Sequence, residues 1–168
     1  VEAGVGVIPG GAGNLGLYEK FIKGLPNGVD IDLQAVVNKV FETIAMAKVS
    51  ASGEEARENN FLDFADSVSV NPDHLIYDAK QAAIALYDAG YRAPVKKKVK
   101  VVGAPGYATL LLGAQGMYDS GFISEYDLAI AKKLAFVLAG GLVPYGTEVE
   151  EEYILGLEKK AFLELVQH

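Results

Sequence analysis

The sequence contains no cysteine, which excludes a disulfide scaffold and any metal site with cysteine ligands. Basic residues are outnumbered: 15 Lys and Arg against 22 Asp and Glu give a net charge of −7, so no basic track for a nucleic acid is expected. No apolar run approaches the roughly 18 residues that a membrane span needs, and the N-terminus lacks the pattern of a secretory signal. These absences predict a cytoplasmic protein without a metal site, a nucleic-acid partner or a membrane span.

What the sequence does contain is enough apolar material for a core. Its 168 residues are 51% hydrophobic, a length and composition that predict one globular domain. The sequence begins with Val1 instead of Met and opens directly on the apolar residues Val5, Val7 and Ile8. We therefore expect the chain to be a piece of a longer polypeptide.

Short runs of β-branched or alternating residues predict a few short strands, over residues 5–8, 67–70 and 99–102. The first of these stops at Pro9-Gly10-Gly11, which predicts a turn. Strands this short and this few do not form a substantial sheet alone, so the chain is predicted to be mainly α.

Apolar residues at helical spacing predict two helices before residue 46. The first covers residues 15–25 and ends at Gly24 and the Pro26-Asn27-Gly28 group. The second has Asp30 as its N-cap and carries an inward stripe between residues 33 and 45.

Capping residues predict two more helices before residue 95. Ser52 and Glu55 have the form of a capping box, which predicts a short helix over residues 54–59 with Asn60 just past its end. Asn71 and Pro72 predict the start of the next helix. Its buried face is predicted to be formed by six apolar residues: Leu75, Ile76, Ala79, Ala82, Ala83 and Leu86.

The last third predicts three helices, over residues 107–119, 125–138 and 148–166. Ser124 with Asp127, and Thr147 with Glu150, have the spacing of capping boxes at the second and third of them. The middle helix is apolar almost all round, which predicts burial on more than one face, in this core or against a partner chain. The helical pattern breaks in the lysine-rich connector after Pro94, and we place an internal boundary there, between residues 1–95 and 96–168.

Residues 11–16 match the glycine pattern G-x-G-x-x-G of dinucleotide-binding folds. That fold requires a second strand ending in an acidic residue about 20 residues further on. Asp30 and Asp32 lie near this place but precede a helix, which disfavours a bound dinucleotide. The alternative is a glycine-rich turn whose free helical N–H groups are available to an anion or a thioester oxygen.

The glycine-rich N-terminus also carries a resemblance. Residues 1–13 resemble the segment of the crotonase (enoyl-CoA hydratase/isomerase) family in which a Glu precedes Gly-x-Ile-Pro-Gly and further glycines. Residues 52–62 are similar to that family's Ser-Ala-x-Glu-Ala helix, with Asn60 in place of a glycine. Residues 121–141 resemble the C-terminal part of multifunctional 3-hydroxyacyl-CoA dehydrogenases whose crotonase domain comes last. The resemblance is weakest around residues 96–108.

The resemblance implies the C-terminal helical portion of a crotonase-like (ClpP/crotonase) α/β fold. Residues 1–95 would be the C-terminal half of the crotonase core, truncated at its N-terminus, and residues 96–168 a helical subdomain. It also implies a role in fatty-acid β-oxidation as part of a 3-hydroxyacyl-CoA dehydrogenase with an enoyl-CoA hydratase domain. The competing hypothesis is a non-catalytic helical module for interaction or oligomerisation.

The same resemblance implies a divided catalytic site. Glu2 matches one of two carboxylates that add water across the double bond of an enoyl-CoA thioester, and the amide of Gly10 helps to hold that water. Gly6, Pro9 and Gly11 match residues that line the substrate. The second carboxylate, the oxyanion hole and the NAD-binding part would precede Val1. We therefore expect no cofactor in this chain, a coenzyme A thioester as substrate, no activity of the isolated chain, and packing against the missing part or against another copy.

Two further groups have less specific interpretations. Lys96, Lys97, Lys98 and Lys100 could contact the phosphates of coenzyme A, or they could form a solvated connector. His74 is interpreted as a surface or capping residue and His168 as part of a frayed end, because no triad or metal partners lie near them in the sequence.

Overall fold

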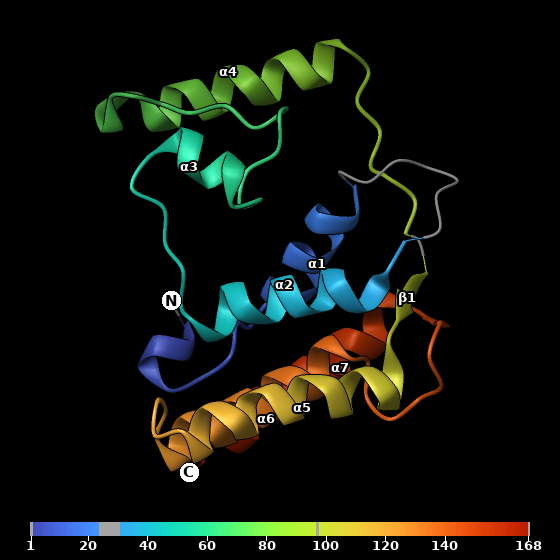
Figure 1. Cartoon of the computed structure of the whole chain (residues 1–168). Helices are drawn as coiled ribbons and strands as arrows, with labels where there is room; N and C mark the ends of the chain where they lie inside the picture. The colour runs from blue at the N-terminus through green and yellow to red at the C-terminus, as the bar shows by residue number, and fades with distance from the viewer. Residues whose placement is uncertain (1, 24–30, 97, 168) are drawn as a thin grey trace.

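A computed structural model describes residues 2–23, 31–96 and 98–167 of the chain. The protein is mainly helical, as the sequence predicts (Figure 1). In chain order the elements are the 3-10 helix η1 (Glu2–Val5), the helices α1 (Gly13–Lys23), α2 (Leu33–Ala45) and α3 (Gly53–Glu58), the 3-10 helix η2 (Pro72–His74), α4 (Leu75–Asp88), the strand β1 (Val99–Val101), α5 (Gly103–Asp119), α6 (Glu125–Leu138), the strand β2 (Thr147–Val149) and α7 (Glu151–Val166).

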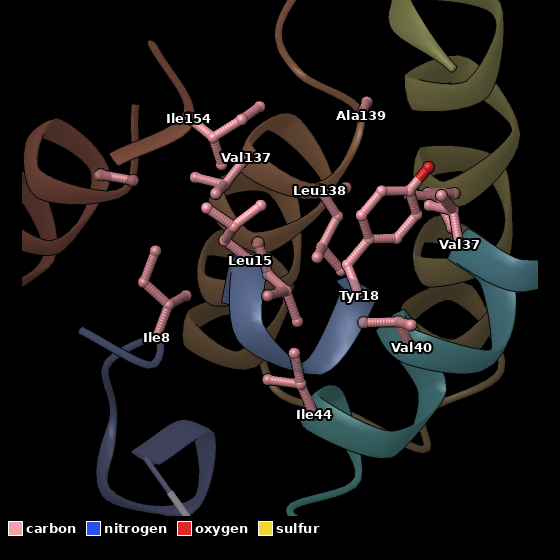
Figure 2. Packing of buried hydrophobic residues seen from close by; sticks show 14 of the residues in the cluster. Ile8, Leu15, Tyr18, Val37, Val40, Ile44, Val137, Leu138, Ala139 and Ile154 are labelled. Atoms are coloured by element: carbon pink, nitrogen blue, oxygen red, sulfur yellow. The ribbon is translucent and has the colours of Figure 1, made fainter. Parts of the chain in front are cut away.

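Helix α6 lies at the centre of the core and packs against α1, α2, α5 and α7. It is buried on more than one face, as its apolar sequence predicts. Figure 2 shows Leu15 and Tyr18 of α1 lying between side chains of α2 and α6. The first 45 residues and the last 70 therefore share one hydrophobic core. The boundary at residue 95 stays a prediction.

The strands β1 and β2 form a short antiparallel ladder in the register Val99 to Val149, Lys100 to Glu148 and Val101 to Thr147. Val99 and Val101 are buried and Lys100 points outward, as alternation in a strand requires. This confirms the strand expected at residue 99, although it ends at Val101. The helix start expected at Thr147 is wrong, because Thr147 pairs in β2 and the helix begins at Glu151.

Local capping signals predicted the starts of α3 and α6 correctly, whereas α5 begins at Gly103, four residues before the expected start. At α6 the Ser124 side chain accepts a hydrogen bond from the Asp127 amide and Asp127 accepts one from the Ser124 amide, a complete capping box. At α3 the Ser52 hydroxyl accepts from the Glu55 amide, and Asn60 has the expected left-handed backbone, with φ of 58°.

The expected strands over residues 5–8 and 67–70 are wrong. Val5 ends the η1 turn, in which the amide of Gly6 donates to the carbonyl of Ala3, and residues 67–70 are irregular. Neither segment finds a strand partner among the residues described, and an unpaired strand has no ladder to stabilise it. The N-cap expected at Asp30 and the helix stop at residues 24–28 lie outside the described residues; Asp32 caps α2, accepting from the amides of Gln34 and Ala35.

The buried face expected on α4 is also wrong. All 14 residues of α4 are exposed, including Ile76 at 81% and Leu86 at 52%. In Figure 1 α4 lies with α3 at the top of the view, away from the layer that contains α2, α5 and α6. The apolar periodicity is real, but no described element covers this face.

Candidate functional site

The candidate residues lie in one continuous segment of the chain, residues 2–11. The middle of this segment is buried in the core. Glu2 and Gly6 lie in and after the η1 turn, while Gly10 and Gly11 lie in the turn before α1. Between them Ile8 is fully buried and Pro9 is buried as well. Burial of these two residues anchors the segment, so that both turns are presented at the surface.

Gly6 sits in a conformation that favours glycine and is held by the C-terminal half. Its φ is 91°, and a Cβ added there would lie 3.2 Å from Cε1 of Tyr126. The hydroxyl of Tyr126, on α6, donates to the Gly6 carbonyl oxygen at 3.0 Å. The η1 turn is therefore attached to a helix 120 residues further along the chain.

The turn from Pro9 to Gly13 contains two consecutive left-handed residues, Gly11 with φ of 62° and Ala12 with φ of 72°. The Gly13 amide donates to the Gly10 carbonyl at 3.3 Å, which closes the turn onto the first residue of α1. A Cβ on Gly10 would touch the ring of Phe162 at 3.7 Å, so α7 forms the floor below this residue.

A buried carboxylate occupies the inner side of the turn. Glu158 on α7 is 3% exposed. Its Oε1 accepts from the Ala12 amide at 2.7 Å, and its Oε2 accepts from the Asn14 amide at 3.3 Å and from Asn14 Nδ2 at 2.8 Å. A carboxylate at the first turn of a helix also interacts favourably with the partial positive charge there. The glycine turn is thus bound internally by an acidic side chain.

This arrangement bears directly on the ligand expected at the turn. The amides of Ala12 and Asn14 donate to Glu158, so the expectation that they are free for an anion or a thioester oxygen is wrong. A dinucleotide phosphate would also meet the negative charge of the Glu158 carboxylate at this position. The glycine pattern here builds a turn around a side chain of the same protein.

Asn14 completes the cluster. It is fully buried, and its Nδ2 donates to the Pro9 carbonyl at 2.7 Å as well as to Glu158. Its Oδ1 is buried without a hydrogen-bond partner in the described structure. One side chain therefore joins the beginning of the turn to the carboxylate that holds its end.

Glu2 is exposed on η1, and a hydrogen bond from its own backbone amide lowers the pKa of its carboxyl group. It is the single acidic residue among the first 16 of the sequence. Acid–base addition of water needs one group that removes a proton and one that supplies it. The segment can contribute one of these groups, together with the exposed backbone of Gly10.

An apolar cavity of about 90 Å³ lies beside η1, between α2, α5 and α6. Its lining includes Ala3, Phe41, Met117 and Ile123, with Asp127 as its one acidic residue. Ala3 follows Glu2 directly, so this cavity adjoins the candidate catalytic turn.

The lysines before β1 are engaged with α7 instead of forming an open cationic cluster. Lys96 Nζ lies 3.5 Å from Glu151 and 2.5 Å from Glu152, and Lys98 Nζ lies 3.3 Å from Glu150. Lys97 lies outside the described residues. These pairs favour the connector interpretation over contact with coenzyme A phosphates.

Two kinds of site are not found in the part of the chain that the structure describes. No group of three or more acidic or histidine side chains there could hold a metal ion, and His74 is exposed. None of the helices in that part is both long and apolar enough to cross a membrane.

Sequence reasoning missed the three residues that hold the candidate segment: Asn14, Tyr126 and Glu158. A signal for Glu158 was present. Ile154, Glu158, Ala161 and Leu165 are spaced as one face of a helix, and all are buried. A single charged residue within such a stripe indicates a buried carboxylate with dedicated partners.

Comparison with known proteins gives one informative match. The chain is 62% identical over 165 residues to a protein of Bacillus subtilis (strain 168) named "Probable 3-hydroxyacyl-CoA dehydrogenase". The alignment covers 98% of this chain and 20% of that relative, so the chain spans about a fifth of the relative's length. No family model matches the chain. No solved structure matches it either.

Proposed function

We propose that this chain is part of a larger 3-hydroxyacyl-CoA dehydrogenase that acts on acyl-CoA thioesters. The observation that carries the proposal is the 62% identity, over nearly the whole chain, to a relative with that name. Because the alignment covers a fifth of the relative, the NAD-binding part of such an enzyme is assigned to sequence outside these 168 residues. We call the longer polypeptide the parent.

Within the parent, we assign this chain to an enoyl-CoA hydratase domain of crotonase-like fold. Glu2 is proposed as one catalytic carboxylate and the exposed Gly10 amide as a donor to the attacking water, with Gly6, Pro9 and Gly11 shaping the substrate side of the two turns. Glu158 is engaged in hydrogen bonds inside the turn, so we assign the second carboxylate to sequence elsewhere in the parent. The 168-residue chain alone is then inactive in hydration.

The exposed helix α4 supports membership of a larger assembly. A helix of 14 residues is marginal in water without packing, and α4 exposes Ile76, Tyr87 and other large apolar side chains. Large exposed apolar surfaces mark contacts with other polypeptide. We assign this face to contact with the rest of the parent.

A second candidate function, a non-catalytic module for oligomerisation, draws on the same observation. The sequence suggested α6 as the associating helix, but α6 is buried within this chain. The exposed helix α4 is therefore the surface that would associate. Sedimentation of the purified chain tests this candidate: oligomers that dissociate when Ile76 is changed to Lys support it, and a monomer at all concentrations contradicts it.

The catalytic proposal is tested in the parent with Glu2→Gln. Hydration of crotonyl-CoA should fall by a factor of at least about 100, the usual contribution of a positioned acid or base, while NAD-dependent oxidation of 3-hydroxybutyryl-CoA is unchanged. Glu54→Gln, at an exposed carboxylate on α3, is the matched control and should alter neither rate. Full hydration by the Glu2→Gln parent would remove Glu2 from the mechanism, and hydration by the 168-residue chain would contradict its assigned inactivity. A parent without NAD-dependent oxidation would overturn the dehydrogenase proposal.

A further inference from the structure

We propose that Glu158 and Asn14 are positioning residues that fix the direction of the Gly10 amide, an inference that rests on the proposed role of Gly10 in hydration. Neither residue was assigned a function from sequence. Both are buried, Glu158 at 3% exposure and Asn14 at 0%, and they contact each other through Asn14 Nδ2 and Glu158 Oε2 at 2.8 Å.

Asn14 fixes the orientation of the peptide unit between Pro9 and Gly10. No described peptide bond is cis, so the carbonyl of Pro9 and the amide of Gly10 point in opposite directions from one planar unit. Asn14 Nδ2 donates to that carbonyl at 2.7 Å and holds it toward the buried cluster. The Gly10 N–H is thereby directed away from the cluster, at a residue whose backbone is exposed.

Glu158 constrains the backbone that follows Gly10. Ala12 has φ of 72°, in the left-handed region that an L-residue rarely adopts. A conformation of this kind persists where the surroundings over-determine it. The 2.7 Å bond from the Ala12 amide to Glu158 Oε1 supplies that constraint. The turn is therefore fixed before Gly10 through Asn14 and after Gly10 through Ala12, and both constraints converge on one carboxylate.

Burying the Glu158 carboxylate is unfavourable unless hydrogen bonds compensate for the lost water. Glu158 occupies a position in an apolar stripe of α7 that an aliphatic side chain would fill without this cost. This cost is offset by the hydrogen bonds that residues 12 and 14 donate to the Glu158 carboxylate. An ordered turn is the structural result of that cluster.

The test uses two variants and one control. Glu158→Gln replaces one acceptor oxygen with an NH₂ group that faces a donor. Asn14→Ala keeps the two backbone bonds to Glu158 and removes the donor to the Pro9 carbonyl. Glu152→Gln, at an exposed position on the same helix, is the control.

In the 168-residue chain the readout is the NMR order parameter of the Gly10 N–H bond. We expect a value of about 0.85, as in a rigid helix, for the unmodified chain and the control, and below about 0.6 in Asn14→Ala and Glu158→Gln. A Gly10 amide that stays equally ordered in Asn14→Ala overturns the proposal. Because Asn14→Ala keeps both backbone hydrogen bonds to the Glu158 carboxylate, it serves even where Glu158→Gln does not fold.

In the parent the readout is steady-state hydration below the unfolding temperature of each variant. Misplacement of the Gly10 amide should lower kcat about 100-fold with little change in KM, while NAD-dependent oxidation stays unchanged. A purely structural role would lower the unfolding temperature without this separation of kcat from KM, and that result contradicts the proposal. If the unmodified parent hydrates nothing, the hydratase assignment fails and the order parameters alone decide whether these residues position Gly10.

Discussion

The hydroxyl of Tyr18 on α1 donates to the carbonyl oxygen of Lys100 on β1 at 2.6 Å, across 82 residues of sequence. Tyr18 is 4% exposed and belongs to the central core cluster. Burial is the main cause that raises the pKa of Tyr18 above its ordinary value of 10.0. The bond ties the first helix to the strand pair and makes this contact sensitive to alkaline pH.

The first prediction follows from the sign of that shift. The folded state favours the neutral phenol, so its contribution to stability is complete below the unfolded pKa near 10 and is lost as the pH rises beyond it. Tyr18→Phe should cost about 1 kcal/mol at pH 7, the usual value of one hydrogen bond, and should remove this alkaline loss. Urea unfolding between pH 7 and 11 measures both, and parallel pH curves for the two proteins would refute the prediction.

The second prediction concerns the capping box of α6. Two hydrogen bonds lower the pKa of Asp127 below its ordinary 3.8. The bond from the Ser124 hydroxyl has the larger effect, and the bond from the Ser124 amide has the smaller one. The stabilisation is therefore present above that value and is lost as the pH falls through the folded pKa. Asp127→Asn should cost about 1 kcal/mol at pH 7, and the difference should disappear in acid. Thermal unfolding between pH 2 and 7 measures this, with Asp88→Asn as an exposed control that changes little.

The third prediction compares two glycines of α5. A Cβ on Gly103 would lie 1.9 Å from the carbonyl oxygen of Val143, and its φ is 59°. A Cβ on Gly113 would meet nothing within 4 Å. Gly103→Ala should therefore cost several kcal/mol or prevent folding, whereas Gly113→Ala should stabilise the isolated chain by roughly 0.5–1 kcal/mol. Chemical unfolding of both variants is the measurement, and similar effects would show that the backbone around Val143 yields.

The fourth prediction separates the core from the face of α4. Ile76 is 81% exposed, so Ile76→Lys should change the stability of the 168-residue chain by less than about 0.5 kcal/mol. In the parent, where we propose that this face is covered, the same substitution should cost about 2 kcal/mol or more. Leu134→Ala, at a fully buried position of α6, should cost about 2–5 kcal/mol in both proteins. Equal small effects of Ile76→Lys in chain and parent would contradict a covered α4.

Features that depend only on residues close together in the sequence were predictable. The bounds of α6 were expected correctly because its capping box and its apolar faces are local properties. Strands depend on a partner: residues 5–8 have strand composition but no ladder, and β2 was missed because its three residues pair with β1 from 46 or more positions away. Apolar periodicity predicts a buried face on α4, but it does not tell which polypeptide buries that face. Among the described residues of this chain, none does.

The residues of the candidate site also divide into those that local sequence predicts and those that only the fold brings together. The glycine turn was predicted from its own residues, and Glu2 was singled out by the resemblance of residues 1–13 to a segment of one enzyme family. Glu158 holds that turn from 144 to 146 residues away, and no short motif can contain both ends of such a contact. Its charge within the buried stripe of α7 indicated an unusual role, but its partners became known only from the fold.

The separation between Glu158 and the turn has a consequence for synthesis on the ribosome. Helix α7 is synthesised more than 100 residues after the turn, a delay on the order of ten seconds at typical rates of translation. During that interval the Ala12 and Asn14 amides have no carboxylate to bind, and the left-handed backbone at Ala12 has nothing to hold it. The turn therefore acquires its native geometry only after α7 has been made.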